Sequence, residues 1–162
     1  MPQPDTPTPF EVVARDAAVR RAPKREVVLR VRELEQLVAG GTPSVVAACL
    51  QDARVLTPRT LRVYEGFAAQ GARVRLLGQG LSAWLAPGVE GVDLDPDDPL
   101  VDQWTLVASG SRCLCFAARD LLSPTPDDAH RDFEWTLTAD PRQVSEVLQR
   151  LGLPEHADVQ RC

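Results

Sequence analysis

Two thiols, at Cys113 and Cys115, are the residues of this sequence with the most direct chemical potential. In an extended strand, residues two apart point to the same face and lie roughly 7 Å apart. A metal or redox centre would need two more ligands, and the sequence has no matching Cys-x-x-Cys or His pair. Because a thiol also packs as a small apolar group, we interpret both as core residues, with redox sensing as the alternative.

An acidic run, Asp93-x-Asp95-x-Asp97-Asp98, has the spacing of the first ligands of a calcium loop. An EF-hand loop requires Gly at its sixth position and a bidentate Glu at its twelfth. Asp98 and Trp104 stand there instead. We therefore predict a solvated acidic turn, with a weak divalent-cation site as the alternative. We assign no metal, and the sequence identifies no particular cofactor.

The pair Gly78-x-Gly80 follows a predicted strand, as phosphate-binding loops do. Ala83 stands where the dinucleotide fingerprint has its third glycine, and no acidic partner follows a further strand. We interpret this segment as a flexible loop. A nucleotide-binding enzyme that uses Gly78 to Gly80 remains an alternative function.

His130 and His156 are the only imidazoles, and both lie in polar segments. A hydrolytic triad needs a nucleophile together with a histidine that a carboxylate orients. Ser109-Gly110-Ser111 supplies only the nucleophile. No paired-carboxylate or base–nucleophile arrangement is evident, so we predict that the chain is not an enzyme.

The bulk composition is that of one globular domain. The 162 residues are 44% hydrophobic and 25% charged, which are ordinary values for a soluble protein. Residues 87–140 hold twelve Asp and Glu against three Arg within a net charge of −5. Because an acidic surface repels phosphate backbones, direct nucleic-acid binding is disfavoured.

Targeting and membrane signals are not evident in the sequence. The Pro-rich start lacks the basic and apolar regions of a signal peptide, and no apolar run is long enough to span a bilayer. Four cysteines make no disulfide framework, so we expect a cytoplasmic setting. We expect a disordered lead-in over residues 1–7, one domain over 8–152 and a tail over 153–162.

Apolar spacing predicts four helices and five strands. Thr57-Pro58 and Asp140-Pro141 are helix starts in which a capping side chain precedes proline, and Gln143 would complete a capping box. Residues 78–91 are expected to form a loop. The predicted helices cover residues 10–18, 24–39, 57–71 and 140–151, and the predicted strands cover 44–50, 73–77, 104–109, 112–118 and 133–137.

These elements predict an α/β fold with a single mixed sheet of about five to six strands flanked by helices. The strand–helix–strand unit over residues 44–77 should be a parallel crossover. The strands around Gly110 should form an antiparallel hairpin, with the second strand inside the sheet because both of its faces are apolar. Trp104, Phe133 and Trp135 belong to these strands, and they are the best candidates to line a small-molecule pocket.

The order of an acidic turn, a Trp-led hairpin and an Arg-x-Phe strand resembles the DICT domain, a sensory module of bacterial diguanylate cyclases and two-component proteins. The resemblance covers about residues 8–150. It departs from the family pattern at Gln103, where an acid is usual, and at Arg30-Val31-Arg32 in the early helix. The matching residues are Asp97-Asp98-Pro99-Leu100, Trp104, Ala117, Arg119-Asp120, Arg131, Phe133, Trp135-Thr136, Val144 and Leu148.

The resemblance implies a non-catalytic sensory or regulatory module of bacterial signal transduction. It would stand alone and bind either a small ligand or a partner protein that carries the output domain, so that the output lies in trans. Homodimerisation is a further expectation. A self-associating scaffold that uses Val27, Val31, Leu34 and Val38 is the remaining alternative. The expected ligand-binding residues are Gln51, Trp104, Arg119, Arg131 and Trp135.

Overall fold

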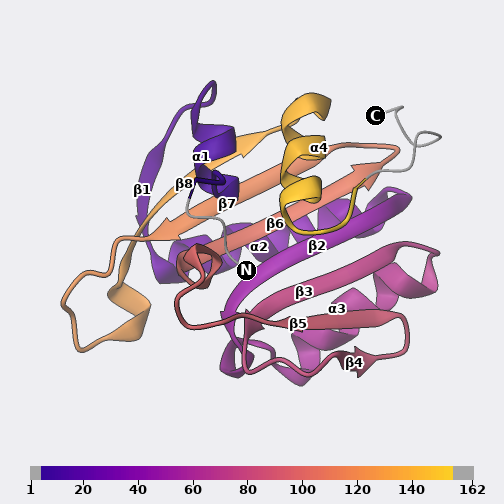
Figure 1. The fold of residues 1–162 in the computed structure, drawn as a ribbon, viewed down its shortest axis with the longest axis horizontal. Coiled ribbons are helices and arrows are strands. Elements are labelled where there is room, and N and C mark those ends of the chain that lie inside the picture. Colours follow the sequence, from indigo (N-terminus) through magenta and orange to yellow (C-terminus); the bar gives the residue numbers. More distant parts are fainter. Residues whose placement is uncertain (1–4, 155–162) are drawn as a thin grey trace.

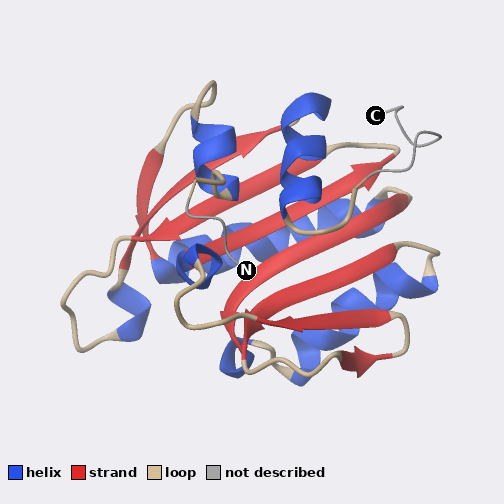
Figure 2. Ribbon diagram, viewed as in Figure 1, coloured by secondary structure: helices blue, strands red, loops and turns tan. Residues whose placement is uncertain are grey.

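The structure of the protein is a computed structural model that describes residues 5–154. Its centre is one eight-stranded sheet with the strand order β1-β8-β7-β6-β2-β3-β5-β4 (Figures 1 and 2). The strands are β1 (Arg20–Pro23), β2 (Pro43–Asp52), β3 (Arg73–Gln79), β4 (Trp84–Ala86), β5 (Val89–Asp93), β6 (Gln103–Gly110), β7 (Leu114–Asp120) and β8 (Asp132–Thr138). The helices are α1 (Pro9–Ala14), α2 (Lys24–Gly40), α3 (Pro58–Ala69) and α4 (Pro141–Arg150), with short 3-10 turns η1 (Ala53–Val55), η2 (Pro99–Asp102) and η3 (Asp128–His130).

The sheet is mixed, as predicted, but it is larger than expected. β2, β3 and β5 run parallel to one another, and every other neighbouring pair is antiparallel. The predicted parallel crossover is confirmed as β2-α3-β3, and the predicted hairpin is confirmed as β6-β7, with β7 inside the sheet. The prediction of five to six strands is wrong because β1, β4 and β5 were missed.

The three missed strands are short and lack a continuous apolar run. β4 and β5 lie within and just beyond the 78–91 segment that was expected to be a loop, where Gly88 at φ +76° turns the chain between them. β1 forms where a helix over residues 10–18 was expected to lead directly to Pro23. That helix ends at Ala14, and residues 20–23 pair with β8 instead.

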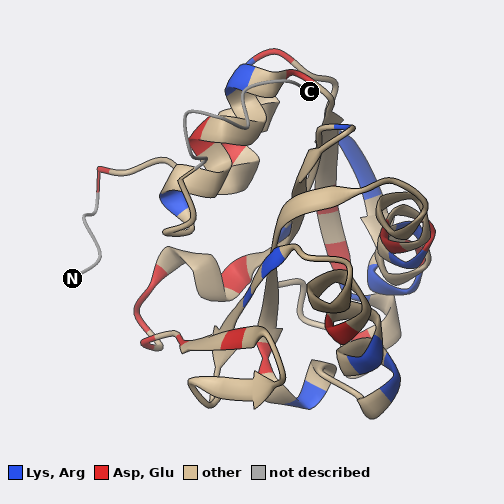
Figure 3. Cartoon of the chain, turned by 90° about the vertical axis from the view of Figure 1, so that its right-hand side faces the viewer, with Lys and Arg blue, Asp and Glu red and all other residues tan. Residues whose placement is uncertain are grey.

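The helices cover both faces of the sheet. α1 and α4 lie on one face, and α2 and α3 lie on the other (Figure 3). Thr8, Thr57 and Asp140 cap α1, α3 and α4 by accepting a hydrogen bond from a backbone N–H of the first turn. The expected capping role of Gln143 is wrong, because its side-chain amide donates to the Val12 carbonyl and joins α4 to α1.

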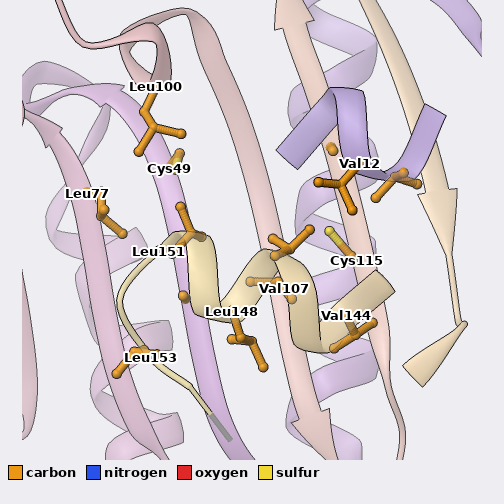
Figure 4. Packing of buried hydrophobic residues seen from close by; sticks show 14 of the residues in the cluster. Val12, Cys49, Leu77, Leu100, Val107, Cys115, Val144, Leu148, Leu151 and Leu153 are labelled. Carbon is orange, nitrogen blue, oxygen red and sulfur yellow. The ribbon is translucent and has the colours of Figure 1, made fainter. Parts of the chain in front are cut away.

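The core under α1 and α4 is built from small and aliphatic side chains (Figure 4). Val144, Val147 and Leu148 of α4 pack on the sheet, as their spacing predicts. Cys49 and Cys115 are fully buried there. Burial raises the pKa of the Cys49 thiol to about 12, and burial also raises the pKa of Cys115. Both therefore behave as apolar core groups.

The opposite core holds most of the aromatic side chains. Phe116 stacks on Trp135 with ring centroids 5.6 Å apart, and Trp104 meets Phe133 edge-on at 6.4 Å. α2 closes this layer with Val27, Val31 and Val38, all of which are buried. The scaffold alternative is therefore wrong in its proposed surface, because that face of α2 packs on the chain's own sheet. None of the helices within residues 5–154 has the length and apolar content that crossing a bilayer requires.

Candidate functional site

A cleft of about 730 Å³ opens on the α2 face, where β2 and β3 end and β6 begins. α2 forms one wall, and the loop that connects β7 to β8 forms another; Figure 1 shows this loop projecting from the sheet beside the start of α2. The lining of the cleft combines an apolar floor with charged groups of both signs. The residues that we call the cleft residues are Lys24, Val28, Val31, Arg32, Glu35, Leu50, Gln51, Asp52, Arg54, Val55, Thr57, Thr60, Gln79, Val101, Asp102, Trp104, Asp120, Leu122, Asp128 and Arg131.

Gln51 lies at an irregular point of the central strand. Between Cys49 and Asp52 the β2–β3 register shifts, so β2 carries one extra residue opposite β3. Gln51 takes a left-handed backbone with φ 66°, which is unfavourable for a side chain other than glycine, asparagine or aspartate. Conformations of this kind concentrate at functional sites, where the surrounding structure maintains them.

The Gln51 side chain joins the two halves of the cleft. Its amide N–H donates to Asp120 Oδ2 at 3.3 Å, and its carbonyl oxygen accepts from Arg131 Nη2 at 3.4 Å. Asp120 has a fully buried side chain and also accepts from the Leu122 backbone N–H at 2.8 Å. Strand β2 is thereby connected to the end of β7 and to the residue that precedes β8.

The β7–β8 loop is fastened to the start of α2 by charge. The Lys24 ammonium ion-pairs with Asp128, and the Lys24 backbone N–H donates to the Arg131 carbonyl at 2.8 Å. Arg131 Nε also lies 2.9 Å from Asp128 Oδ1. Lys24 acts mainly through a hydrogen bond to lower the pKa of Asp128, so this carboxylate stays charged at neutral pH. These contacts hold one wall of the cleft in place.

Trp104 contributes an aromatic surface to the cleft. It is 5% exposed, and its indole N–H is buried without a hydrogen-bond partner in the described chain. A buried donor of this kind has lost its hydration without compensation. Lys24 Nζ lies 5.8 Å from the ring centroid, a distance at which a cation is attracted to an aromatic face.

Two carboxyl groups of the cleft have raised pKa values. Glu35 of α2 is 7% exposed, and burial raises its pKa, although the Tyr64 hydroxyl and Arg32 oppose the change. Burial likewise raises the pKa of Asp102, and the neighbouring charge of Asp120 adds to the effect. Raised carboxyl pKa values in a cleft are a common property of functional sites.

Three of the five residues expected to bind a ligand meet at this cleft: Gln51, Trp104 and Arg131. Arg119 does not, because it points to the opposite face of the sheet, where it pairs with Glu134 and lies 4.5 Å from the Phe10 ring centroid. Trp135 is on the correct face but is packed between Phe116 and two arginines, away from the cleft. The assignment of Arg119 and Trp135 to the cleft is therefore not supported by their positions.

Sequence reasoning missed eight of the nine charged residues of the cleft, among them Lys24, Glu35, Asp102 and Asp120. Alternation along β7 could have identified Asp120, because it shares a face with Phe116 and Ala118. Asp102 could likewise have been placed two residues before Trp104. No local signal reveals that Glu35, on a helix face of ordinary pattern, would face the cleft.

The other candidate sites lie elsewhere. The Gly80 N–H donates to the Asp93 carboxylate at 2.7 Å, and β4 follows instead of a helix, so this loop lacks the form of a phosphate-binding turn. His130 is exposed and pairs with Asp127. His156 lies outside the described residues. Within residues 5–154 no group of three or more His, Cys, Asp or Glu could hold a metal ion.

Comparisons with known proteins bear on the fold. Neither protein-family models nor curated proteins match the sequence. A polyphosphate kinase from Porphyromonas gingivalis matches 94% of this chain with a TM-score of 0.51 and 18% identity, and this chain spans only 29% of that structure. Nuc, a phospholipase D family member from Salmonella typhimurium, matches 85% of this chain and 93% of its own length, with a TM-score of 0.52 and 9% identity. The archaeal chromatin protein TrmBL2 matches 85% of this chain and 52% of its own, with a TM-score of 0.48 and 13% identity.

These likenesses correct one prediction. We expected that the chain is not an enzyme, but two of the solved structures that share its fold are a kinase and a phospholipase D family member. That expectation rested on the lack of a recognisable reaction centre in the sequence, and sequence motifs are a weak guide at identities this low. The shared architecture is one that catalytic proteins use.

Proposed function

We propose that this chain is a regulatory ligand-binding module of bacterial signalling, and that its ligand occupies the cleft between α2 and the β7–β8 loop. The observation that carries the proposal is Gln51, a nearly buried residue held in a left-handed backbone beside this cleft. Strain of about 1 to 3 kcal/mol persists only where other contacts maintain it. Here those contacts are made by Asp120 and Arg131, which also line the cleft.

Signal output would follow from the same contacts. A ligand that displaces or reinforces the Gln51–Asp120–Arg131 network would bias the position of the β7–β8 loop, because Arg131 is part of that loop's attachment to α2. A partner protein that carries the output domain would detect this change. The resemblance to the DICT domain supports a role in signalling, and membership of that family is part of the proposal.

Native mass spectrometry of protein purified gently from its own host tests the proposal. We expect a non-covalent mass adduct on the wild-type chain, and we expect it to be lost from Gln51→Ala and Trp104→Leu. Arg119→Gln is the control, because Arg119 is a strand residue that lies on the opposite face of the sheet, beside Phe10. It should keep the adduct.

Folding of each variant is checked by its thermal unfolding midpoint. A bare wild-type chain, or an adduct that survives both cleft substitutions in folded protein, would contradict the proposal. Loss of the adduct from Arg119→Gln would move the site to the α1 face.

A further inference from the structure

We propose that the ligand is a small organic cation, an ammonium or amidinium group on an apolar body, held by Asp102 and the indole of Trp104. This inference rests on the proposed function, since it assumes that the cleft takes a small molecule. It adds the chemical class of that molecule and the residues that recognise its charge.

One carboxylate in the lining of the cleft has no cation paired with it. Three of its cations are already paired, Lys24 with Asp128, Arg54 with Asp52, and Arg131 with Asp120. Arg32 lies in the field of Glu35. The remaining charged group is Asp102, whose carboxylate has no hydrogen bond or ion pair within residues 5–154. The unbalanced charge of the lining is therefore a single negative one.

Asp102 and Trp104 both line the cleft, Asp102 as the last residue of η2 and Trp104 as the second residue of β6. They flank Gln103, whose side chain points to the other face and accepts a hydrogen bond from the Phe10 N–H at 3.1 Å. Asp102 and Trp104 are two positions apart in the chain and line the same cleft, so one ligand can contact both the carboxylate and the indole. Cations are attracted to both a carboxylate and an aromatic face, and the buried indole N–H has no hydrogen-bond partner within residues 5–154.

The electrostatics favour a cation over the phosphate compounds that a fold-based guess would suggest. Burial and the charge of Asp120 both raise the pKa of Asp102, so its ionised form is poorly stabilised by the protein alone. A bound cation would supply that stabilisation. An anion would instead meet five carboxyl groups in the lining. The apolar floor of Val28, Val31 and Leu50 suits the uncharged body of the ligand.

Benzamidine, benzamide and benzoate test the inference, because they share a shape and differ in charge. Binding is measured by calorimetry and by tryptophan fluorescence in a Trp84→Phe/Trp135→Phe background, which removes the 69% exposed indole of Trp84 and leaves Trp104 as the one tryptophan. We expect benzamidine to bind about ten times more tightly than the other two, or better, as a charge-assisted hydrogen bond provides. Asp102→Asn should abolish this preference, and Asp102→Glu should keep it.

Asp97→Asn is the matched control, since it removes an equal charge from an exposed position outside the cleft. It should leave the preference unchanged. Equal binding of all three compounds, a preference that survives Asp102→Asn, or equal losses in Asp102→Asn and Asp97→Asn would overturn the inference.

Failure of this inference can be told apart from failure of the proposed function. If the mass adduct on the native protein proves to be neutral or anionic and is lost on cleft substitution, the ligand class is wrong while the cleft remains the binding site. If no adduct is present and benzamidine does not bind, both are wrong.

Discussion

The guanidinium of Arg131 is bonded to the carboxylate of Asp120 at 2.5 Å, and the Asp120 side chain has no exposed surface. The pair lies where β7 ends and β8 is about to begin, and it faces the cleft. Asp120 is also bonded to Gln51 of the central strand, so one buried charge organises three strands. The Asp120–Arg131 pair therefore contributes both to the stability of the fold and to the shape of the cleft.

Removal of Arg131 should therefore be costly. Arg131→Met leaves the Asp120 carboxylate buried without its cation, and we expect a loss of about 3 kcal/mol in the free energy of unfolding, near the lower end for a broken buried pair because Arg131 is 25% exposed. Urea unfolding of the variant and the wild type measures this loss.

The double variant Asp120→Asn/Arg131→Met is its control. It removes the uncompensated charge and should be more stable than Arg131→Met alone by about 1 kcal/mol or more. Additive losses from the two substitutions would show that the pair does not contribute as a unit.

The buried carboxyl group of Glu35 should make stability depend on pH. Because burial raises its pKa above the ordinary value of 4.5, the folded chain holds the Glu35 proton more tightly than the unfolded chain does. The corresponding stability is present below about pH 4.5 and is lost as the pH rises through the folded pKa. Relative to Glu35→Gln, the wild type should therefore lose stability over this range.

Denaturant titrations at several pH values follow this difference between the two proteins. Tyr64→Phe should steepen it, because the Tyr64 hydroxyl favours the charged form of Glu35. A wild type and Glu35→Gln that change in parallel with pH would mean that Glu35 titrates as an ordinary exposed acid.

The buried thiols should be inert in the folded protein. Burial raises the pKa of Cys49 to about 12 and also raises that of Cys115, so neither forms an appreciable thiolate at pH 8. We expect iodoacetamide to leave both residues unmodified in the native chain and to modify them in urea, as peptide mass mapping will show. Native labelling at either position would contradict the prediction and show that the thiol is accessible and reactive in the folded chain.

The β4–β5 pairing, which the sequence did not reveal, can be tested at Gly91. A Cβ at this position would lie 2.0 Å from the Ser82 carbonyl oxygen, so Gly91→Ala must displace the backbone before β4. We expect a loss of about 2 kcal/mol or more in unfolding free energy. Gly66→Ala is the matched control in α3, where nothing lies within 4 Å, and it should gain about 0.5 to 1 kcal/mol. If Gly91→Ala leaves the free energy of unfolding unchanged, the backbone at Ser82 does not lie against Gly91 and the prediction is contradicted.

The elements with strong local signals were predictable. Thr57-Pro58 and Asp140-Pro141 mark helix starts because capping and the fixed φ of proline act within a few residues, and both helices begin where expected. β2 and β7 were identified because strands buried on both faces are apolar throughout. β1, β4 and β5 were not, since strands of three to five residues at or next to a sheet edge gain their stability from pairing partners and not from their own pattern.

The cleft was predictable only in part, for a related reason. Trp104 and Arg131 stand out by residue type and by family resemblance, and both line the cleft. Arg119 was wrongly grouped with them, although strand alternation separates it from Asp120 by a whole sheet face. The left-handed backbone of Gln51 depends on a register shift between two strands, which no single strand encodes.

The contacts of Gln51 have a consequence for how the chain could be divided. Its partners Asp120 and Arg131 are 69 and 80 positions away, so each half of the sequence contributes part of the cleft and neither contains it. A cut in the exposed turn between β5 and η2 would separate the two contributions. Fragments produced there should bind the ligand only as a reassembled pair, and the ligand should in turn promote their association. The molecule is thus suited to serve as a split reporter for its own ligand.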